Sequence, residues 1–138
     1  MKCPICCHSV PDNELRCPLC LAPLTVWKNL DMYAEQAFAC GLEQVARERL
    51  EEAAESLLKA VTFAPEEAAY LDTYGRVLGR LGRYHEAAAV LRRASRLDPN
   101  EGTQAALEKA EQLADLRRDA LCKQPESTEA TAPDPPEA

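Results

Sequence analysis

Apolar and polar residues follow a helical pattern through most of the chain, from about residue 31 to residue 121. Alanine, leucine, glutamate and arginine dominate this stretch, and all four are strong helix formers. Aromatic residues are scarce, so extended sheet is not expected here. The pattern predicts four helices, at Asp31 to Ala46, Leu50 to Phe63, Ala68 to Leu81 and Tyr84 to Leu97. We therefore expect a mainly α protein.

A fifth helix is predicted from Thr103 to Leu121, where apolar residues recur at helical spacing at Ala106, Ala110 and Leu113. The opposite face of this helix carries charged side chains. We interpret residues 102–121 as a helix that caps the helical body and gives its end a polar face toward solvent.

The helical region contains an internal repeat with a period of 34 residues. When residues 34–67 are aligned with residues 68–101, ten of the 34 positions are identical. Average composition would give only about two or three identities. The shared positions include Gly41 with Gly75, Leu57 with Leu91, and Pro65 with Pro99. Each 34-residue unit is therefore expected to form the same helical hairpin.

This period, and its order of small, apolar and proline positions, resembles the tetratricopeptide repeat family. The second copy is the better match, through Tyr74-Gly75, Leu81-Gly82-Arg83-Tyr84 and Leu97-Asp98-Pro99-Asn100. The first copy has no glycine in its turn, at Arg47-Glu48-Arg49. The resemblance implies two helical hairpins, at residues 34–67 and 68–101. Gly75 is expected where two antiparallel helices cross closely, and Gly82 where a helix ends in a left-handed conformation.

The resemblance also implies that the first helix of each repeat lines a concave groove that binds another polypeptide. The residues expected on this face are Glu35, Phe38, Leu42, Val45, Asp72, Arg76 and Arg80. An apolar or amphipathic segment with an acidic flank would fit them. The alternative is that the apolar side chains among them are covered by the N-terminal residues and that the arginines form an ordinary solvated face.

The N-terminal residues carry two identical cysteine spacings, Cys3-Pro4-Ile5-Cys6 and Cys17-Pro18-Leu19-Cys20. A Cys-x-x-Cys turn lets two sulfurs approach one metal ion, and two such turns supply the four ligands of tetrahedral zinc. Residues 1–30 bury too little apolar surface to fold alone, so metal binding is expected to stabilise them. They resemble the zinc-ribbon family, which implies a small β module with Leu24-Thr25-Val26-Trp27 as a strand.

Two details of this module stay open in the sequence. Ribbon turns usually continue with glycine, whereas Cys7 and Leu21 occupy those positions here. Cys7 and His8 lie close enough in sequence to compete as ligands. Zn²⁺ with a structural role is the expected cofactor, because four thiolates leave no open coordination position. Iron in a rubredoxin-like site is the alternative.

The composition limits the classes of partner. The formal net charge of −7 disfavours nucleic acid. No stretch is long and apolar enough to span a bilayer, and the first residues form no signal-peptide pattern. Seven cysteines in a chain with no export signal indicate metal ligands or thiols rather than disulfides. A cytoplasmic protein is therefore expected. Residues 122–138 are expected to be a disordered tail, rich in proline and acidic residues.

The sequence offers no catalytic arrangement, because neither His8 nor His85 lies in a motif that would make it a general base. We therefore expect a non-enzymatic adapter or scaffold that binds another protein. The alternatives are a nucleic-acid-associated zinc-ribbon protein and a redox or electron-transfer protein. Two repeats are fewer than the usual three, so the missing stability is expected to come from the cap helix, from docking of the N-terminal module, or from self-association into a homo-oligomer.

Overall fold

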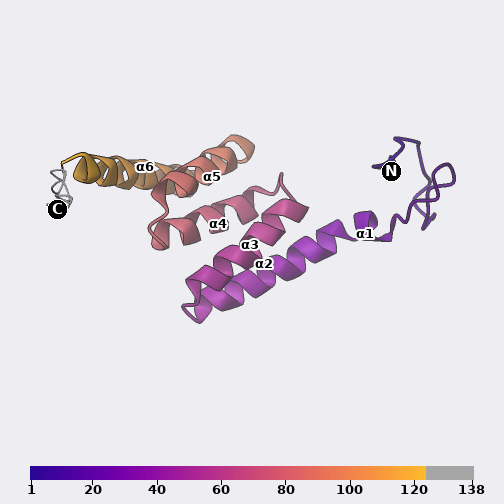
Figure 1. Ribbon diagram of the computed structural model, residues 1–138, viewed down its shortest axis with the longest axis horizontal. Helices are drawn as coiled ribbons and strands as arrows, with labels where there is room; N and C mark the ends of the chain where they lie inside the picture. Colours follow the sequence, from indigo (N-terminus) through magenta and orange to yellow (C-terminus); the bar gives the residue numbers. More distant parts are fainter. Residues whose placement is uncertain (124–138) are drawn as a thin grey trace, which may run out of the picture.

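The computed structural model describes residues 1–123 and is built from helices (Figure 1). The elements are α1 (Thr25–Lys28), α2 (Leu30–Ala46), α3 (Leu50–Phe63), α4 (Ala68–Arg80), α5 (Tyr84–Leu97) and α6 (Glu101–Cys122). The mainly α fold class is thereby confirmed. Helix α6 extends to Cys122, so the first residue of the segment expected to be a disordered tail is helical, and residues 124–138 of that segment lie outside the described part. In residues 1–123 no helix is long and apolar enough to cross a membrane.

The long helices form two antiparallel hairpins, α2 with α3 and α4 with α5, and each hairpin crosses at a glycine. A Cβ atom added at Gly41 would lie 2.8 Å from Leu57 Cγ, and one added at Gly75 would lie 2.6 Å from Leu91 Cγ. Both leucines are fully buried. The expected close crossing at Gly75 is therefore present, and the first hairpin repeats it.

The turns inside the two hairpins have the same geometry despite their different sequences. Gly82 has a φ of 80° and Glu48 a φ of 59°, both in the left-handed region. The Arg83 N–H donates to the Leu78 carbonyl at 3.0 Å, and the equivalent Arg49 N–H donates to the Gln44 carbonyl at 2.9 Å. A left-handed residue at this point satisfies the last carbonyls of the preceding helix. The first repeat thus keeps the turn without the glycine.

Helix α6 packs against α5 and closes the core at the C-terminal end. Its buried residues are Thr103, Ala110 and Ala114, so its apolar stripe faces the hairpins as the sequence predicted. It begins at Glu101 because the Asn100 side chain accepts a hydrogen bond from the Thr103 N–H at 3.0 Å, which caps the first turn. The start is therefore earlier than the predicted Thr103.

The expected β module is not supported. Within residues 1–123 there is no named strand, and the N-terminal residues form only two isolated bridges, Lys2 with Ser9 and Arg16 with Pro23. Pro23 has no N–H, so it cannot extend the second bridge into a ladder. The strand predicted at Leu24 to Trp27 is wrong, because Thr25–Lys28 forms the short helix α1.

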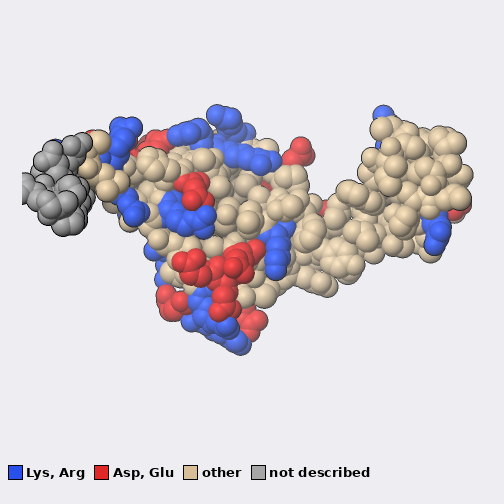
Figure 2. Space-filling model, in the orientation of Figure 1, with Lys and Arg blue, Asp and Glu red and all other residues tan. Residues whose placement is uncertain are grey.

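The N-terminal residues lie at one end of the molecule and lead through α1 into the long helix α2 (Figure 1). No hydrogen bond or ion pair joins residues 1–23 to residues 34–123. In Figure 2 the visible face of this end is largely uncharged, whereas acidic and basic side chains gather over the repeat helices. The two parts of the chain therefore differ in surface chemistry as well as in structure.

Candidate metal centre and partner groove

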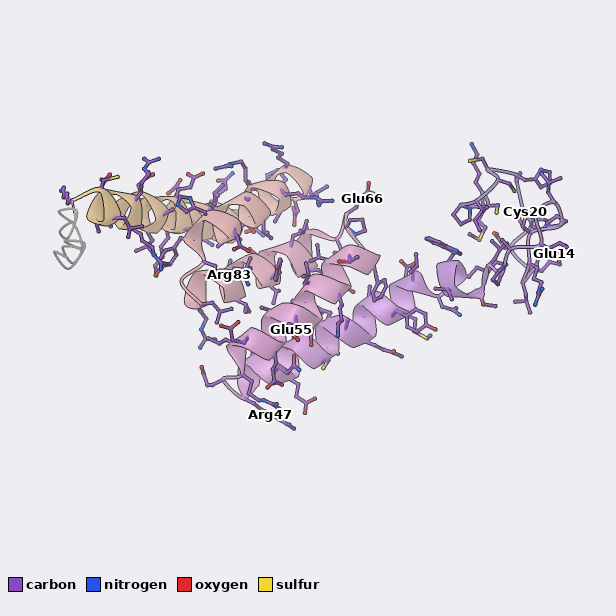
Figure 3. All side chains as sticks on the ribbon, viewed as in Figure 1. Glu14, Cys20, Arg47, Glu55, Glu66 and Arg83 are labelled. Atoms are coloured by element: carbon purple, nitrogen blue, oxygen red, sulfur yellow. The ribbon has the colours of Figure 1, made fainter. Side chains whose placement is uncertain are left out.

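Four cysteine sulfurs converge at the N-terminal end of the molecule, where Cys20 is labelled in Figure 3. The sulfurs of Cys3, Cys6, Cys17 and Cys20 all lie within 4.8 Å of one another. The closest pairs join the two turns, with Cys3 Sγ 3.6 Å from Cys20 Sγ and Cys6 Sγ 3.5 Å from Cys17 Sγ. Metal–sulfur bonds of about 2.3 Å in a tetrahedron separate the sulfurs by about 3.8 Å. The cluster therefore fits one metal ion bound by four thiolates, but its geometry does not identify the metal.

The two cysteine turns are copies of each other at an offset of 14 residues. The Cys3 N–H donates to the His8 carbonyl at 2.9 Å, and the equivalent Cys17 N–H donates to the Ala22 carbonyl at the same distance. Cys7 and Leu21 both have a φ of 58°, in the left-handed region that favours glycine. Cys7 and Leu21 therefore adopt the turn conformation that ribbon turns usually leave to glycine. Each of them does so at a cost of about 1–2 kcal/mol.

Burial separates the four cysteines into two pairs. Cys3 and Cys17, the first cysteine of each turn, are 1% and 0% exposed, and they pack with the equivalent apolar residues Val10 and Leu24. The second cysteine of each turn lies nearer to solvent. Cys7 and His8 are exposed and do not belong to the cluster of four. The pairing places a small apolar core on one side of the site and solvent on the other.

The environment also divides the thiols by acidity. A backbone hydrogen bond from Cys6 is the main cause that lowers the pKa of Cys3 to about 6, and one from Cys20 likewise lowers the pKa of Cys17. A backbone hydrogen bond from His8 lowers the pKa of Cys6, but burial and the neighbouring thiols raise it to about 12. For Cys20, a backbone hydrogen bond lowers the pKa, but burial and other thiols raise it overall. Four adjacent sulfurs therefore resist full ionisation unless a cation balances their charge.

The residues predicted for the groove on α2 are only partly open. Phe38 stacks on Tyr70 of α4, with ring centroids 4.4 Å apart, and Val45 packs against the core. Leu42 is 44% exposed and Glu35 is exposed. Phe38 and Val45 are thus covered by the second repeat and the core, rather than by the N-terminal residues as in one alternative from the sequence, whereas Leu42 remains open.

The residues predicted on α4 lie beside α6. Asp72 Oδ1 accepts a hydrogen bond from the Thr103 hydroxyl at 3.0 Å, and Asp72 Oδ2 accepts one from Arg76 Nε at 2.7 Å. Arg80 Nη2 donates to Glu48 Oε2 at 2.8 Å, across the two repeats. Asp72 therefore holds α6 in place, while the two arginines remain about half exposed.

A groove of about 650 Å³ opens between α4 and α6, and Arg76 and Arg80 line it. Sequence reasoning missed the contribution of α6, which supplies Lys109 and several alanines to the opposite wall. The sequence of α6 was interpreted only as a cap, so the side chains with which it faces α4 were not considered. The groove thus combines two predicted residues with a wall that was not predicted.

Comparison with known proteins supports the helical hairpin assignment for part of the chain. Residues 68–101 match the family model described as "Tetratricopeptide repeat". No curated protein matches the chain. The matched residues are those of the predicted second repeat and comprise α4 and α5. The chain therefore contains a tetratricopeptide repeat at residues 68–101.

Proposed function

We propose that this protein is a non-enzymatic adapter whose repeat helices bind a partner polypeptide. Tetratricopeptide repeats generally mediate binding to other proteins, and residues 68–101 match this family. The observation that carries the proposal is the open groove between α4 and α6, whose volume lies in the range of binding pockets. It is bordered by half-exposed arginines and lined by small residues, so a partner chain can reach its floor.

Gly79 offers a test of this groove. It lines the groove, and a Cβ atom added there would meet nothing within 4 Å. Gly79→Trp should fill the groove without displacing the core, while Gly79→Ala should leave it open. We expect a polypeptide that cross-links to and co-purifies with the natural protein and Gly79→Ala, but not with Gly79→Trp. Equal capture by all three proteins, or capture by none, would contradict the proposal.

The four-cysteine cluster is proposed to hold a structural Zn²⁺ ion. All four ligands come from the protein, so the ion would have no open position for catalysis. Bound metal would supply the folding free energy that this small segment lacks, on the order of 10 kcal/mol. Elemental analysis of purified protein should give one zinc per chain. Iron would instead colour the protein and favour the electron-transfer alternative.

The remaining alternatives have less support. Residues 1–33 carry three basic and three acidic side chains, so this end offers no positive surface for nucleic acid. The proposal places the protein in the cytoplasm, where reducing conditions keep thiols available for metal. Turnover that disappears when one cysteine is replaced would contradict the non-enzymatic role.

A further inference from the structure

The groove between α4 and α6 has a floor made of small residues. Gly79 of α4 and Gly102, Ala105 and Ala106 of α6 line it, and Leu91 of α5 lies at its base. Side chains this small leave room for a polypeptide backbone to approach the helices closely.

The rim of the groove is positively charged. Arg76, Arg80 and Lys109 line it, and none of its lining residues is acidic. Lys109 makes no ion pair among residues 1–123. Arg76 pairs with Asp72, whose side chain is 24% exposed, whereas Arg80 pairs with Glu48, whose side chain is 74% exposed, so the Arg80–Glu48 pair is the weaker of the two. A ligand carboxylate can therefore replace Glu48 on Arg80 at little cost, while Arg76 donates to Asp72 only through Nε and keeps its terminal nitrogens for a ligand.

The other half of the concave side, between α2 and α4, has the opposite character. The stacked rings of Phe38 and Tyr70 lie there. Burial raises the pKa of Tyr70, and the nearby carboxylates of Glu35, Glu67 and Asp31 raise it further. An acidic ligand is therefore repelled from this half and attracted to the α4–α6 groove.

The spacing of the arginines adds a geometric preference. Arg76 and Arg80 are four residues apart on α4, which corresponds to about 6 Å along the helix axis. In an extended chain, side chains on one face recur about every 6.6 Å. Carboxylates at alternate residues of an extended segment would therefore meet the two guanidinium groups in register.

The geometry points to an acidic polypeptide segment as the occupant of the α4–α6 groove, bound in extended form with glutamate or aspartate at alternate positions and small residues between. This inference rests on the proposed function and specifies its partner chemistry. Planar guanidinium groups bind carboxylates through paired hydrogen bonds, which gives this segment its orientation. Side-chain carboxylates, rather than a chain terminus, make the contacts.

The test uses the full chain and a fluorescein-labelled peptide of five Glu-Ala units, amidated at its C-terminus. Fluorescence anisotropy should show binding that weakens as salt increases. Matched peptides of Gln-Ala and Lys-Ala units should not bind. A peptide with its five glutamates consecutive and its five alanines consecutive should bind more weakly than the alternating one. Equal binding of the glutamine peptide or of the block peptide would overturn the inference.

Variants separate the groove from overall charge. The double variant Arg76→Gln with Arg80→Gln should lower affinity roughly tenfold. Lys59→Gln with Arg96→Gln removes the same charge from exposed positions outside the groove, and should change affinity less than twofold. Circular dichroism checks that all variants keep their helices. The inference fails if both double variants lose affinity equally.

Three further results would also overturn the inference. Inorganic phosphate that displaces the peptide at equal concentration would indicate a simple anion site. If the Glu-Ala peptide bound only to a shortened chain that ends at Lys123, residues 124–138 would be the occupant of the groove in the full chain. In the third result, a partner is captured by the natural protein but not by Gly79→Trp, and the Glu-Ala peptide does not bind. This result would leave the proposed function intact and refute only the acidic chemistry.

Discussion

Two glycines on α4 provide a direct test of the packing that defines the repeat. Gly75 lies at the crossing with α5, where an added Cβ atom would lie 2.6 Å from Leu91 Cγ and 2.8 Å from Leu91 Cδ2. Gly79 lies one turn later on the same helix, and an added Cβ atom there meets nothing within 4 Å. Gly75→Ala and Gly79→Ala therefore make the same chemical change in opposite surroundings.

The difference between the two variants isolates the steric cost. Replacing a helical glycine by alanine stabilises a helix by about 0.5–1 kcal/mol. This gain applies to both variants, so it largely cancels in the comparison. Leu91 is 1% exposed and has no solvent to move into, so overpacking at Gly75 should cost about 1–3 kcal/mol. Gly79→Ala should therefore be more stable than the natural protein, and Gly75→Ala should be less stable than Gly79→Ala by that amount.

Thermal unfolding followed by circular dichroism measures this difference. For a body of this size each kcal/mol shifts the Tm by about 4–8 °C, so Gly79→Ala should melt at least about 4 °C above Gly75→Ala. Leu91→Ala should cost about 2–5 kcal/mol in the natural protein and less in Gly75→Ala, because the added methyl group fills part of the cavity. If Gly75→Ala melts as high as Gly79→Ala, the close helix crossing is not present in solution.

Three further predictions concern the caps and the metal. Asn100→Ala should lower the free energy of unfolding by about 1 kcal/mol, measured in urea, because the cap of α6 is lost; an unchanged value would contradict the cap. Cys17→Ser should abolish stoichiometric zinc but keep the helical circular dichroism, because no hydrogen bond or ion pair joins residues 1–23 to residues 34–123. Loss of both the zinc and the helical signal would show that the two parts fold together. Zinc binding at neutral pH should release protons, those of Cys6 and Cys20 at least, because the pKa values of these two thiols are raised, and the apparent affinity should therefore fall as the pH falls. Calorimetry in buffers of different ionisation enthalpy measures this release, and the same enthalpy in every buffer would refute it.

The helical body was largely readable from the sequence. The predicted bounds of α3 and α5 agree with the structure at both ends, and those of α2 and α4 differ by one residue at one end. These helices could be located because proline and the internal repeat mark their limits at equivalent positions in both copies. The turn at Glu48 shows the limit of this reasoning, because a non-glycine residue adopts the left-handed conformation there.

The N-terminal end was less predictable, although the four cysteines of its cluster were identified by spacing alone. The run from Leu24 to Trp27 has high strand propensity, yet Thr25–Lys28 is helical. Leu24 is fully buried beside the cysteine cluster, and the Lys28 ammonium donates to the carbonyls of Asp12 and Glu14. These contacts with residues earlier in the chain override local propensity, and no local pattern could reveal them.

The lining of the groove between α4 and α6 was only partly predictable for a related reason. Arg76 and Arg80 were named because the resemblance to tetratricopeptide repeats implies that this face of α4 is concave. The stack of Phe38 on Tyr70 and the position of Lys109 depend on how successive helices are rotated against each other. That rotation is set by side chains from different helices, so it appears only when the hairpins are assembled.

Helix α6 covers the C-terminal end of the two hairpins. A repeat array loses stability at its ends, because the last hairpin exposes a face that a following repeat would cover. Here α6 covers the exposed face of α5, and the Arg92–Glu111 ion pair and the Arg117 hydrogen bond to the Gly82 carbonyl join it to the second repeat. Since α6 also forms one wall of the groove, the helix that completes the core is the same helix that completes the proposed binding site. Changes in α6 should therefore affect stability and partner affinity together, whereas changes at Arg76 should affect affinity far more than stability.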